Sequence, residues 1–378
     1  MAKKITYLLG AGASAKALPT IRNMSLRMKY FFELAKLVLE RMPRQNLLDK
    51  NRIKIYEKLL VEIEELGTPD IVAKTLVFKG QKAKNELQLL KHLLSCYMLF
   101  EQLAEPEEHH KFFEKEIAKE TWSKMTAEMD ESESKFPSVT IDNRYVEFLS
   151  TCLKKNESDE LKFPDNLKIL SWNYDHQIER ALGYISSKPL VQLQHEFGIF
   201  PLTDNDDHHR SRDNKITEEI LIKEAIKSSV FKLNGTAGFI PKSNKSLFDI
   251  NSQTLDDRAW KTIVNIMFNE FEPVVEENKL AFAWDEDIPR ISACRRACLP
   301  SLKGAEVVVV IGYSFPNFNR KIDRQLFSTF KGSKIYLQDP YAADISAKLD
   351  GVKKDLQNIA IPVNSSGSFL VPDEFWEL

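Results

Sequence analysis

Long apolar runs are missing from this 378-residue sequence: no stretch is long enough to cross a bilayer, and the first residues lack the apolar core and cleavage site of a signal peptide. A long basic run is missing too, and the formal net charge is only −2. The charge gives no support to nucleic-acid binding, because such proteins gather lysine and arginine on one surface. We expect a cytoplasmic protein of bacterial or archaeal type, without membrane or direct nucleic-acid contacts.

Cysteine is scarce, and its spacing argues against the common zinc modules. The four cysteines form no paired C-x-x-C motifs and there is no H-E-x-x-H motif, so we expect no metal. Cys294 and Cys298 lie one helical turn apart, and we interpret them as thiols that face the core. The sequence also lacks the G-x-x-x-x-G-K-[ST] loop of ATPases and the G-x-S-x-G turn of esterases.

The sequence does contain an alternation of buried strands and helices. Short apolar runs predict strands at 4–9, 167–171, 229–233, 305–312 and 334–338. Helical spacing predicts helices at about 257–270, 290–302 and 318–330. Another helix is predicted to begin near Asp175, with Asp175 as its N-cap. With 43% hydrophobic residues to fill a core, this order predicts an α/β fold with a doubly wound, mostly parallel Rossmann-like sheet.

A long helical segment separates the first strand from the others. Residues 21–155 repeat apolar side chains at helical spacing and contain no convincing strand. We predict an all-helical insertion over 21–155 and a Rossmann-like domain built from 1–20 and 156–378. The polar stretches at 130–134 and 204–214 are predicted to be loops.

A glycine-rich turn follows the first strand, and it reads G-A-G-A-S-A from Gly10. Ligands of doubly wound sheets bind at the carboxyl ends of the strands, and glycines let the backbone approach a pyrophosphate at a helix N-terminus. A tight strand–helix turn without a ligand is the alternative interpretation. A dehydrogenase would also need a second strand and an acidic residue about 20 residues later. The helical segment stands there instead, so the turn favours nucleotide binding over dehydrogenase activity.

Five short motifs occur in an order that resembles a known family. GAGAS (10–14), LPT (18–20), SWNYD (171–175), KLNGT (232–236) and VIGYSFP (310–316) together are similar to the sirtuin-like proteins of bacterial anti-phage defence. The resemblance covers the sheet-forming parts of the chain. Members of that family hydrolyse NAD on infection, often carry a long helical insertion, and usually lack the zinc module of deacetylases. The resemblance therefore implies an NAD glycohydrolase that releases nicotinamide and ADP-ribose.

The resemblance also implies roles for individual residues. In nucleotide binding it implicates Gly10, Ala11, Gly12, Ala13, Ser14, Thr20, Gly312, Ser314 and Asp339. The glycine turn would cradle the pyrophosphate, and the last three residues would lie near the adenosine. Asn173 would contact the nicotinamide ribose and place the attacking water, and Asp175 would brace its loop.

Asn234 departs from the family pattern, which has a catalytic histidine at this position. An amide is no general base near neutral pH. Hydrolysis could proceed without a base, because positioned polar groups stabilise an oxocarbenium-like state. Another histidine could replace it, with His195 a better candidate than His176 or the loop pair His208 and His209. The chain could also bind NAD or ADP-ribose without turnover, or carry an engineered inactivating change.

Regulation would have to come from outside the catalytic domain, because unchecked NAD hydrolysis would harm the host. Without a separate sensor domain, this need points to a partner protein or to assembly into a homo-oligomer, and lone sirtuin-like chains of this size are similar to those that pair with a HerA-type hexameric ATPase. The insertion is rich in leucine, phenylalanine and methionine, which indicates either a self-assembly surface or its own core. The alternative function is a non-catalytic nucleotide sensor or scaffold in a defence complex.

Overall fold

A computed structural model describes residues 2–40, 50–103, 139–188, 190–201, 218–241, 257–268, 275–285 and 288–377. The chain forms two compact units. The sheet unit comprises Met1–Ser14, Ile141–Thr236 and Ala281–Leu378, and the helical unit comprises Ala15–Thr140 and Ala237–Leu280.

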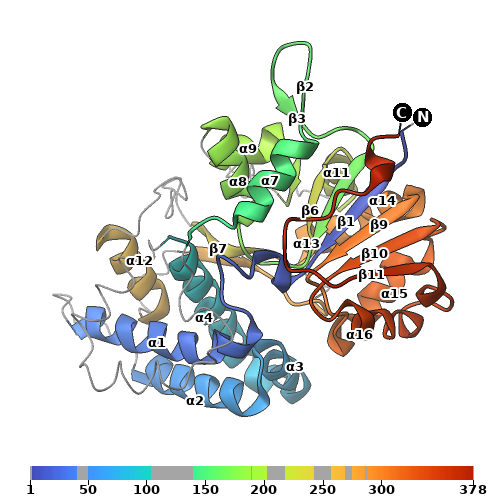
Figure 1. Ribbon diagram of the computed structural model, residues 1–378. Helices are drawn as coiled ribbons and strands as arrows, with labels where there is room; N and C mark the ends of the chain where they lie inside the picture. The colour runs from blue at the N-terminus through green and yellow to red at the C-terminus, as the bar shows by residue number, and fades with distance from the viewer. Residues whose placement is uncertain are drawn as a thin grey trace. The chain divides into compact units, whose positions relative to one another are not determined.

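The sheet unit is built on seven parallel strands in the order β11-β10-β9-β1-β4-β6-β5 (Figure 1). The strands are β1 (Ile5–Leu9), β4 (Leu167–Ser171), β5 (Ile199–Phe200), β6 (Val230–Lys232), β9 (Val307–Ile311), β10 (Lys334–Gln338) and β11 (Ala360–Val363). The chain adds strands on one side of β1 and then crosses to the other side at β9. This arrangement confirms the predicted doubly wound, Rossmann-like α/β fold.

Helices cover both faces of this sheet, because both faces of its central strands are apolar. Alternate residues of β1 enter two cores: Tyr7 and Leu9 pack in one, and Leu8 in the other. The first face carries α7 (Asn143–Cys152), α8 (Gln177–Ser186) and α9 (Leu190–Glu196). The second carries α11 (Glu218–Ala225), α13 (Pro289–Ala297), α14 (Leu299–Gly304), α15 (Arg320–Ser328) and α16 (Ala342–Ser346).

Short elements complete the sheet unit. A hairpin joins β2 (Lys154–Lys155) to β3 (Leu161–Lys162), and 3-10 helices occur at η1 (Ala11–Ser14), η4 (Asn317–Asn319), η5 (Leu349–Gly351), η6 (Gln357–Ile359) and η7 (Asp373–Phe375). The C-terminal segment returns across the first face, where the Tyr7 hydroxyl donates to the Leu370 carbonyl at 2.9 Å and Phe369 packs on Tyr145. Phe369 and Phe375 of this segment therefore belong to the core of the sheet unit.

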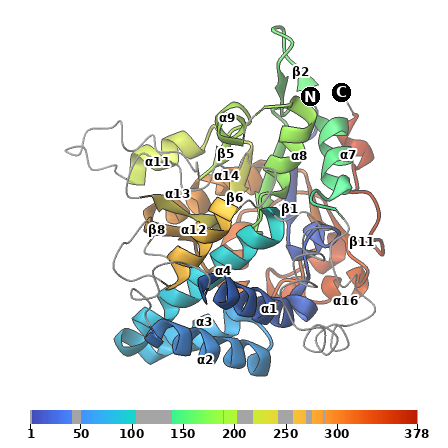
Figure 2. The same ribbon diagram turned by 90° about the vertical axis from the view of Figure 1, so that its left-hand side faces the viewer.

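The helical unit contains α1 (Ile21–Glu40), α2 (Lys50–Leu66), α3 (Pro69–Lys79), η3 (Gly80–Ala83), α4 (Lys84–Leu103) and α12 (Asp257–Phe268). Figure 2 shows α1 to α4 gathered together, and Phe32, Tyr56 and Phe268 pack their rings against one another in its core. A buried ion pair joins Arg27 on α1 to Glu101 on α4. The unit also holds β8 (Val275–Leu280), which pairs with β7 (Gly235–Pro241).

The unit boundaries differ from the sequence prediction of a 21–155 insertion. The described residues of the insertion are mostly helical, although β2 lies at its end, and α7 packs on the sheet unit because Tyr145, Phe148 and Leu149 enter its core. The segment Ala237–Leu280 joins the helical unit, so that unit is assembled from two distant parts of the chain. Sequence periodicity reports which face of a helix is apolar, and not which core the face enters.

The structure confirms some of the other sequence predictions and corrects one. The strands at 167–171 and 334–338 are confirmed, and all four cysteines are buried and free. The predicted N-cap Asp175 was wrong by one residue: His176 is the N-cap of α8, and the Asp175 carboxylate accepts from the Gln177 amide at 3.0 Å. The loops predicted at 130–134 and 204–214 lie outside the described residues. Among the helices described, none is both long and apolar enough to span a membrane.

Candidate functional site

Two tight turns pack against each other where the chain changes sides of the sheet. One follows β1 and the other follows β9, the next strand in the sheet. A methyl group on Gly10 would lie 2.6 Å from the Gly312 carbonyl oxygen, and one on Gly12 would lie 2.8 Å from the Gly312 Cα. Gly312 itself has φ +60° and would carry a side chain into the backbone of Gly12 and Ala13. These positions need glycine to let the turns meet.

The glycine turn uses much of its hydrogen-bonding capacity within the protein. The Gly10 amide donates to Ile311, the Gly12 amide to Gly312, and the Ala13 amide to Gly10, all at 2.9–3.0 Å. The predicted helix N-terminus behind the turn is also absent: η1 is a four-residue 3-10 helix, and α1 begins only at Ile21. The structure thus gives these backbone amides partners other than a pyrophosphate, and only Ala11 in the turn is exposed.

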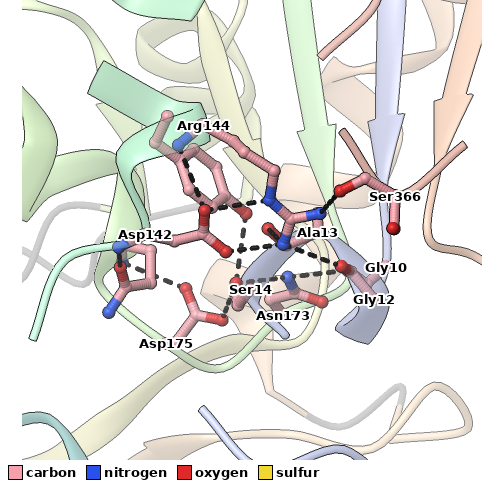
Figure 3. Close-up of polar contacts among 11 residues, drawn as sticks. Gly10, Gly12, Ala13, Ser14, Asp142, Arg144, Asn173, Asp175 and Ser366 are labelled. Atoms are coloured by element: carbon pink, nitrogen blue, oxygen red, sulfur yellow. Dashed lines mark hydrogen bonds and ion pairs between the residues drawn. The ribbon is translucent and has the colours of Figure 1, made fainter. Parts of the chain in front are cut away.

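Asn173 binds the glycine turn with its side chain (Figure 3). Its Nδ2 donates to the Gly10 carbonyl at 2.9 Å and to the Ser14 hydroxyl at 3.2 Å. A carbonyl oxygen cannot donate, so the amide atom that faces Gly10 has to be nitrogen. The orientation of the amide is therefore fixed, and Oδ1 makes no hydrogen bond with the residues described.

Ser14 lies at the centre of this polar network. Its hydroxyl donates to Asp175 Oδ2 at 2.7 Å, and Tyr145 is 3.1 Å away on the other side. The single proton of Ser14 goes to the carboxylate, so Tyr145 and Asn173 must be the donors to its oxygen. All three positions of the hydroxyl are thereby used. In the described structure, Ser14, predicted to cradle a pyrophosphate, joins three protein groups (Figure 3).

Arg144, which was not predicted as a site residue, binds the back of the glycine turn. Its Nη2 donates to the carbonyls of Gly12 and Ala13 at 3.3 and 3.1 Å, and Nη1 donates to Ser366 at 3.3 Å. The buried Asp142 carboxylate balances the charge, with its oxygens 2.5 and 2.9 Å from the guanidinium. An Asp-Asn-Arg sequence before a helix signals an N-cap, but nothing in it reveals the contact with the glycine turn.

A buried ion pair connects the last residue of β6 with helix α8. The Lys232 ammonium lies 3.2 Å from Glu179 Oε2 and donates to the Asp175 carbonyl at 2.6 Å. Both side chains are fully buried, and burial raises the pKa of Glu179 above its ordinary value. Apart from a lysine within a predicted strand, nothing in the sequence indicates this pair.

Asn234, two residues beyond Lys232, is fixed by a buried arginine. Arg295 Nη2 donates to Asn234 Oδ1 at 3.0 Å, while Arg295 Nε donates to the Leu233 carbonyl at 2.8 Å. The Asn234 carbonyl accepts from the Ala281 amide at 2.9 Å. Asn234 therefore lies at the same carboxyl edge of the sheet as Asn173, since β6 and β4 are adjacent and parallel.

The remaining predicted residues have different positions. Ser314 is exposed, and its carbonyl accepts from Lys348 at 3.2 Å. Asp339 follows β10 and accepts from the Tyr341 amide at 2.8 Å, which caps the next turn. Thr20 belongs to the helical unit, where its carbonyl accepts from the Met24 amide at the start of α1.

The histidines proposed as substitutes for a base differ in their surroundings. His195 is exposed on α9 and precedes β5 by four residues, so it lies near the amino end of a strand whose carboxyl end borders the site edge. This position argues against His195 as the general base that replaces the histidine of the family pattern. His176 is buried beside Asp175, and His208 and His209 lie outside the described residues.

No cluster of three or more potential metal ligands occurs in the part of the chain that the structure describes. The described residues at this edge include two fixed amides, one serine–aspartate pair and three buried cations, Arg144, Lys232 and Arg295. Compared with protein-family models, the sequence finds no match, and compared with curated proteins it finds none either.

Proposed function

We propose that the carboxyl edge of the sheet binds NAD and cleaves the bond between nicotinamide and ribose, giving nicotinamide and ADP-ribose. One observation carries the proposal: turns after β1, β4, β6 and β9 meet at this edge, at the change of strand order where doubly wound sheets bind ligands. They bring together the motifs of Gly10–Ser14, Asn173–Asp175, Asn234 and Gly312–Ser314. The order of these motifs in the sequence is what resembles the sirtuin-like family.

The side-chain oxygen Oδ1 of Asn173 supports this reaction because it is an available hydrogen-bond acceptor. Both protons of its amide are used by Gly10 and Ser14, so Oδ1 is offered as an acceptor. An acceptor held in place suits a ribose hydroxyl or a water molecule that attacks the carbon from which nicotinamide leaves. Departure of nicotinamide leaves a cationic, oxocarbenium-like sugar, which a fixed amide oxygen also stabilises.

The Ser14–Asp175 pair keeps Asn173 in this orientation. Asp175 accepts from Ser14 and from the Gln177 amide, so its two oxygens hold the serine against the start of α8. In this proposal Asp175 positions other groups and does not touch the substrate. The pyrophosphate would lie over the exposed side of the glycine turn at Ala11.

The direct test is incubation of the purified protein with NAD, followed by measurement of free nicotinamide. We expect release by the natural chain and loss of release in Asn173→Ala. The matched control is Asn166→Ala, because Asn166 borders the same strand at its opposite end and donates to the Lys3 carbonyl. Tight NAD binding by calorimetry without any nicotinamide would rule out the enzyme and leave a binding protein.

A second candidate function, nucleotide binding without turnover, is favoured by Asn234. An amide at this position removes the general base that the family pattern provides, which is typically worth about 10²–10⁴-fold in rate. Asn234→His separates the two candidates: a large gain in hydrolysis would mean that the natural chain is a weak or silent enzyme. An unchanged rate would mean that the chemistry needs no base there.

We also propose that the NAD hydrolysis serves anti-phage defence. NAD depletion in anti-phage defence requires control, which we assign to a partner ATPase of the HerA type or to assembly into a homo-oligomer. Measuring the mass of the native particle, alone and with a co-purified ATPase, tests this part independently of catalysis.

A further inference from the structure

The side-chain amide of Asn234 has only one possible orientation. Its contact is Arg295 Nη2 at 3.0 Å, and a guanidinium has donors but no acceptor. The amide atom that faces Arg295 must therefore be oxygen, and Nδ2, the other terminal atom of the amide, points away from this contact. Among the residues that the structure describes, Nδ2 makes no hydrogen bond, and 5% of the residue stays exposed.

Arg295 is held rigidly enough to keep Asn234 in place. Besides Leu233 and Asn234, its N–H groups donate to the carbonyls of Phe282, Ala283 and Asp285 at 2.9–3.0 Å. All five donors of the guanidinium are thus used. A side chain with every donor satisfied in a buried site cannot turn without losing several hydrogen bonds.

The partners of Arg295 are all neutral oxygens. Within the described residues it has no ion pair, and the Asp285 carboxylate accepts instead from the Phe282 amide at 2.8 Å. Only 8% of Arg295 is exposed, so its positive charge is weakly screened. A positive potential directly behind Asn234 strengthens the donor character of its Nδ2 and favours an electron-rich oxygen in front of it.

We infer that Asn234 is a specificity-determining hydrogen-bond donor, which Arg295 locks into place to bind an acceptor oxygen of the ligand. The inference rests on the proposed function for the identity of that ligand. In NAD the suitable oxygens are the carboxamide carbonyl of nicotinamide and the phosphate oxygens. Asn173 and Asn234 then form a pair of opposite polarity: the first accepts and the second donates.

The decisive variant is Asn234→Asp, which keeps the oxygen that faces Arg295 and replaces the donor by a second acceptor. We expect NAD binding, measured by calorimetry, to weaken at least tenfold, because the carboxylate repels the ligand oxygen that the amide attracts. Asn166→Asp at the opposite end of β4 is the control and should leave NAD affinity unchanged. Equal NAD affinity of Asn234→Asp and the natural chain would overturn the inference.

ADP-ribose identifies which oxygen is bound, because it has both phosphates but no carboxamide. Weakening of NAD binding alone assigns the carboxamide carbonyl, and equal weakening of both ligands assigns a phosphate oxygen. An unchanged affinity for both ligands contradicts a donor role at position 234.

A measurement without ligand separates this inference from the proposed function. In Asn234→Asp the new carboxylate faces a buried guanidinium that has no ion pair, so the thermal midpoint should stay the same or rise. A lower midpoint would contradict the contact that orients the amide. If the natural chain neither binds nor cleaves NAD, the proposed function fails and the ligand assignment fails with it, while the midpoint still reports on the lock.

Discussion

The two sides of β1 hold their turns in different ways. On the side of β4 and β6, buried side chains bind one another: Ser14, Asn173, Asp175 and Lys232 form one connected network. On the side of β9 and β10, the turns depend on backbone packing at Gly312, and the predicted polar residues there are exposed or half-exposed. The first side is organised before any ligand arrives, whereas the second leaves the predicted binding residues Ser314 and Asp339 at least partly in solvent.

This difference indicates how the proposed reaction is divided between the two sides. Bond cleavage requires groups fixed to within a fraction of an ångström, and a satisfied buried network supplies such fixation. Binding of an adenosine end tolerates side chains that settle only when the ligand is present. Buried changes on the first side should therefore cost the most stability, and polar changes on the second side should cost the least.

The largest effect is expected at Lys232, which links the end of β6 to α8 and to the turn at Asp175. Lys232→Met leaves the buried Glu179 without its cation, and loss of one partner of a buried pair costs about 3–5 kcal/mol. Urea unfolding of the variant measures this loss. Since an apolar replacement of both partners is often neutral, Lys232→Met with Glu179→Leu should recover most of it. A single variant as stable as the natural chain would show that the network is not what holds this side.

Gly312→Ala tests the backbone packing of the second side. Its φ of +60° and the closeness of Gly12 leave no room for a methyl group. Overpacking together with a left-handed conformation should cost about 2–3 kcal/mol. Gly304→Ala is the control, because its nearest contact would be the Lys4 side chain at 3.8 Å. Similar unfolding free energies for the two variants would remove backbone packing as the cause.

The serines at 14 and 314 sharpen the comparison, since the sequence predicted similar roles for both. Ser14→Ala removes three hydrogen bonds and leaves a buried Asp175 oxygen without a donor, which should cost about 1–2 kcal/mol. Ser314→Ala changes an exposed hydroxyl and should stay within about 0.5 kcal/mol. Chemical denaturation of the two variants side by side measures the difference. If both lose the same stability, the two sides are not organised differently.

The strands of the sheet could be predicted from the sequence, whereas most buried polar contacts at the site could not. The strands were predictable because continuous apolar runs such as 307–311 suit strands buried on both faces, and parallel order then places their ends at one edge. Parallel order placed Gly10 and Gly312 at one edge, but their contact depends on β1 and β9 being neighbours, which the structure shows. Arg144, Arg295 and Glu179 could not be predicted, because each contacts residues far away in sequence and no local pattern distinguishes a buried charge from an exposed one.

The sequence also could not predict which side-chain atoms at the site donate or accept hydrogen bonds, for a similar reason. Asn173 and Asn234 are the same residue type after neighbouring strands, and only their partners give them opposite polarity. Ser14 was predicted to face a phosphate because it ends a glycine turn, yet Asp175 and Tyr145 compete for its hydroxyl. Buried polar groups bind whichever partner the fold supplies, and that supply is a property of tertiary structure.

The smallest effect is expected behind the Gly312 turn, at Asp323. The Tyr313 hydroxyl lies 2.9 and 3.0 Å from the two Asp323 oxygens, and burial raises the pKa of this carboxyl from 3.8 to about 7. Because the folded pKa is raised, the contribution to stability is complete below about pH 4 and is lost as the pH rises through about 7.

Asp323→Asn keeps the shape of the side chain and its acceptor for Tyr313, but removes the titration. Between pH 5 and 6 the natural chain should lose at most about 1.4 kcal/mol relative to the variant, since one pKa unit corresponds to that amount. Urea midpoints of both proteins at the two pH values measure the difference, and groups that titrate elsewhere cancel in it. Parallel pH curves would mean that Asp323 is ionised throughout, and that charge as well as backbone packing holds the second side together.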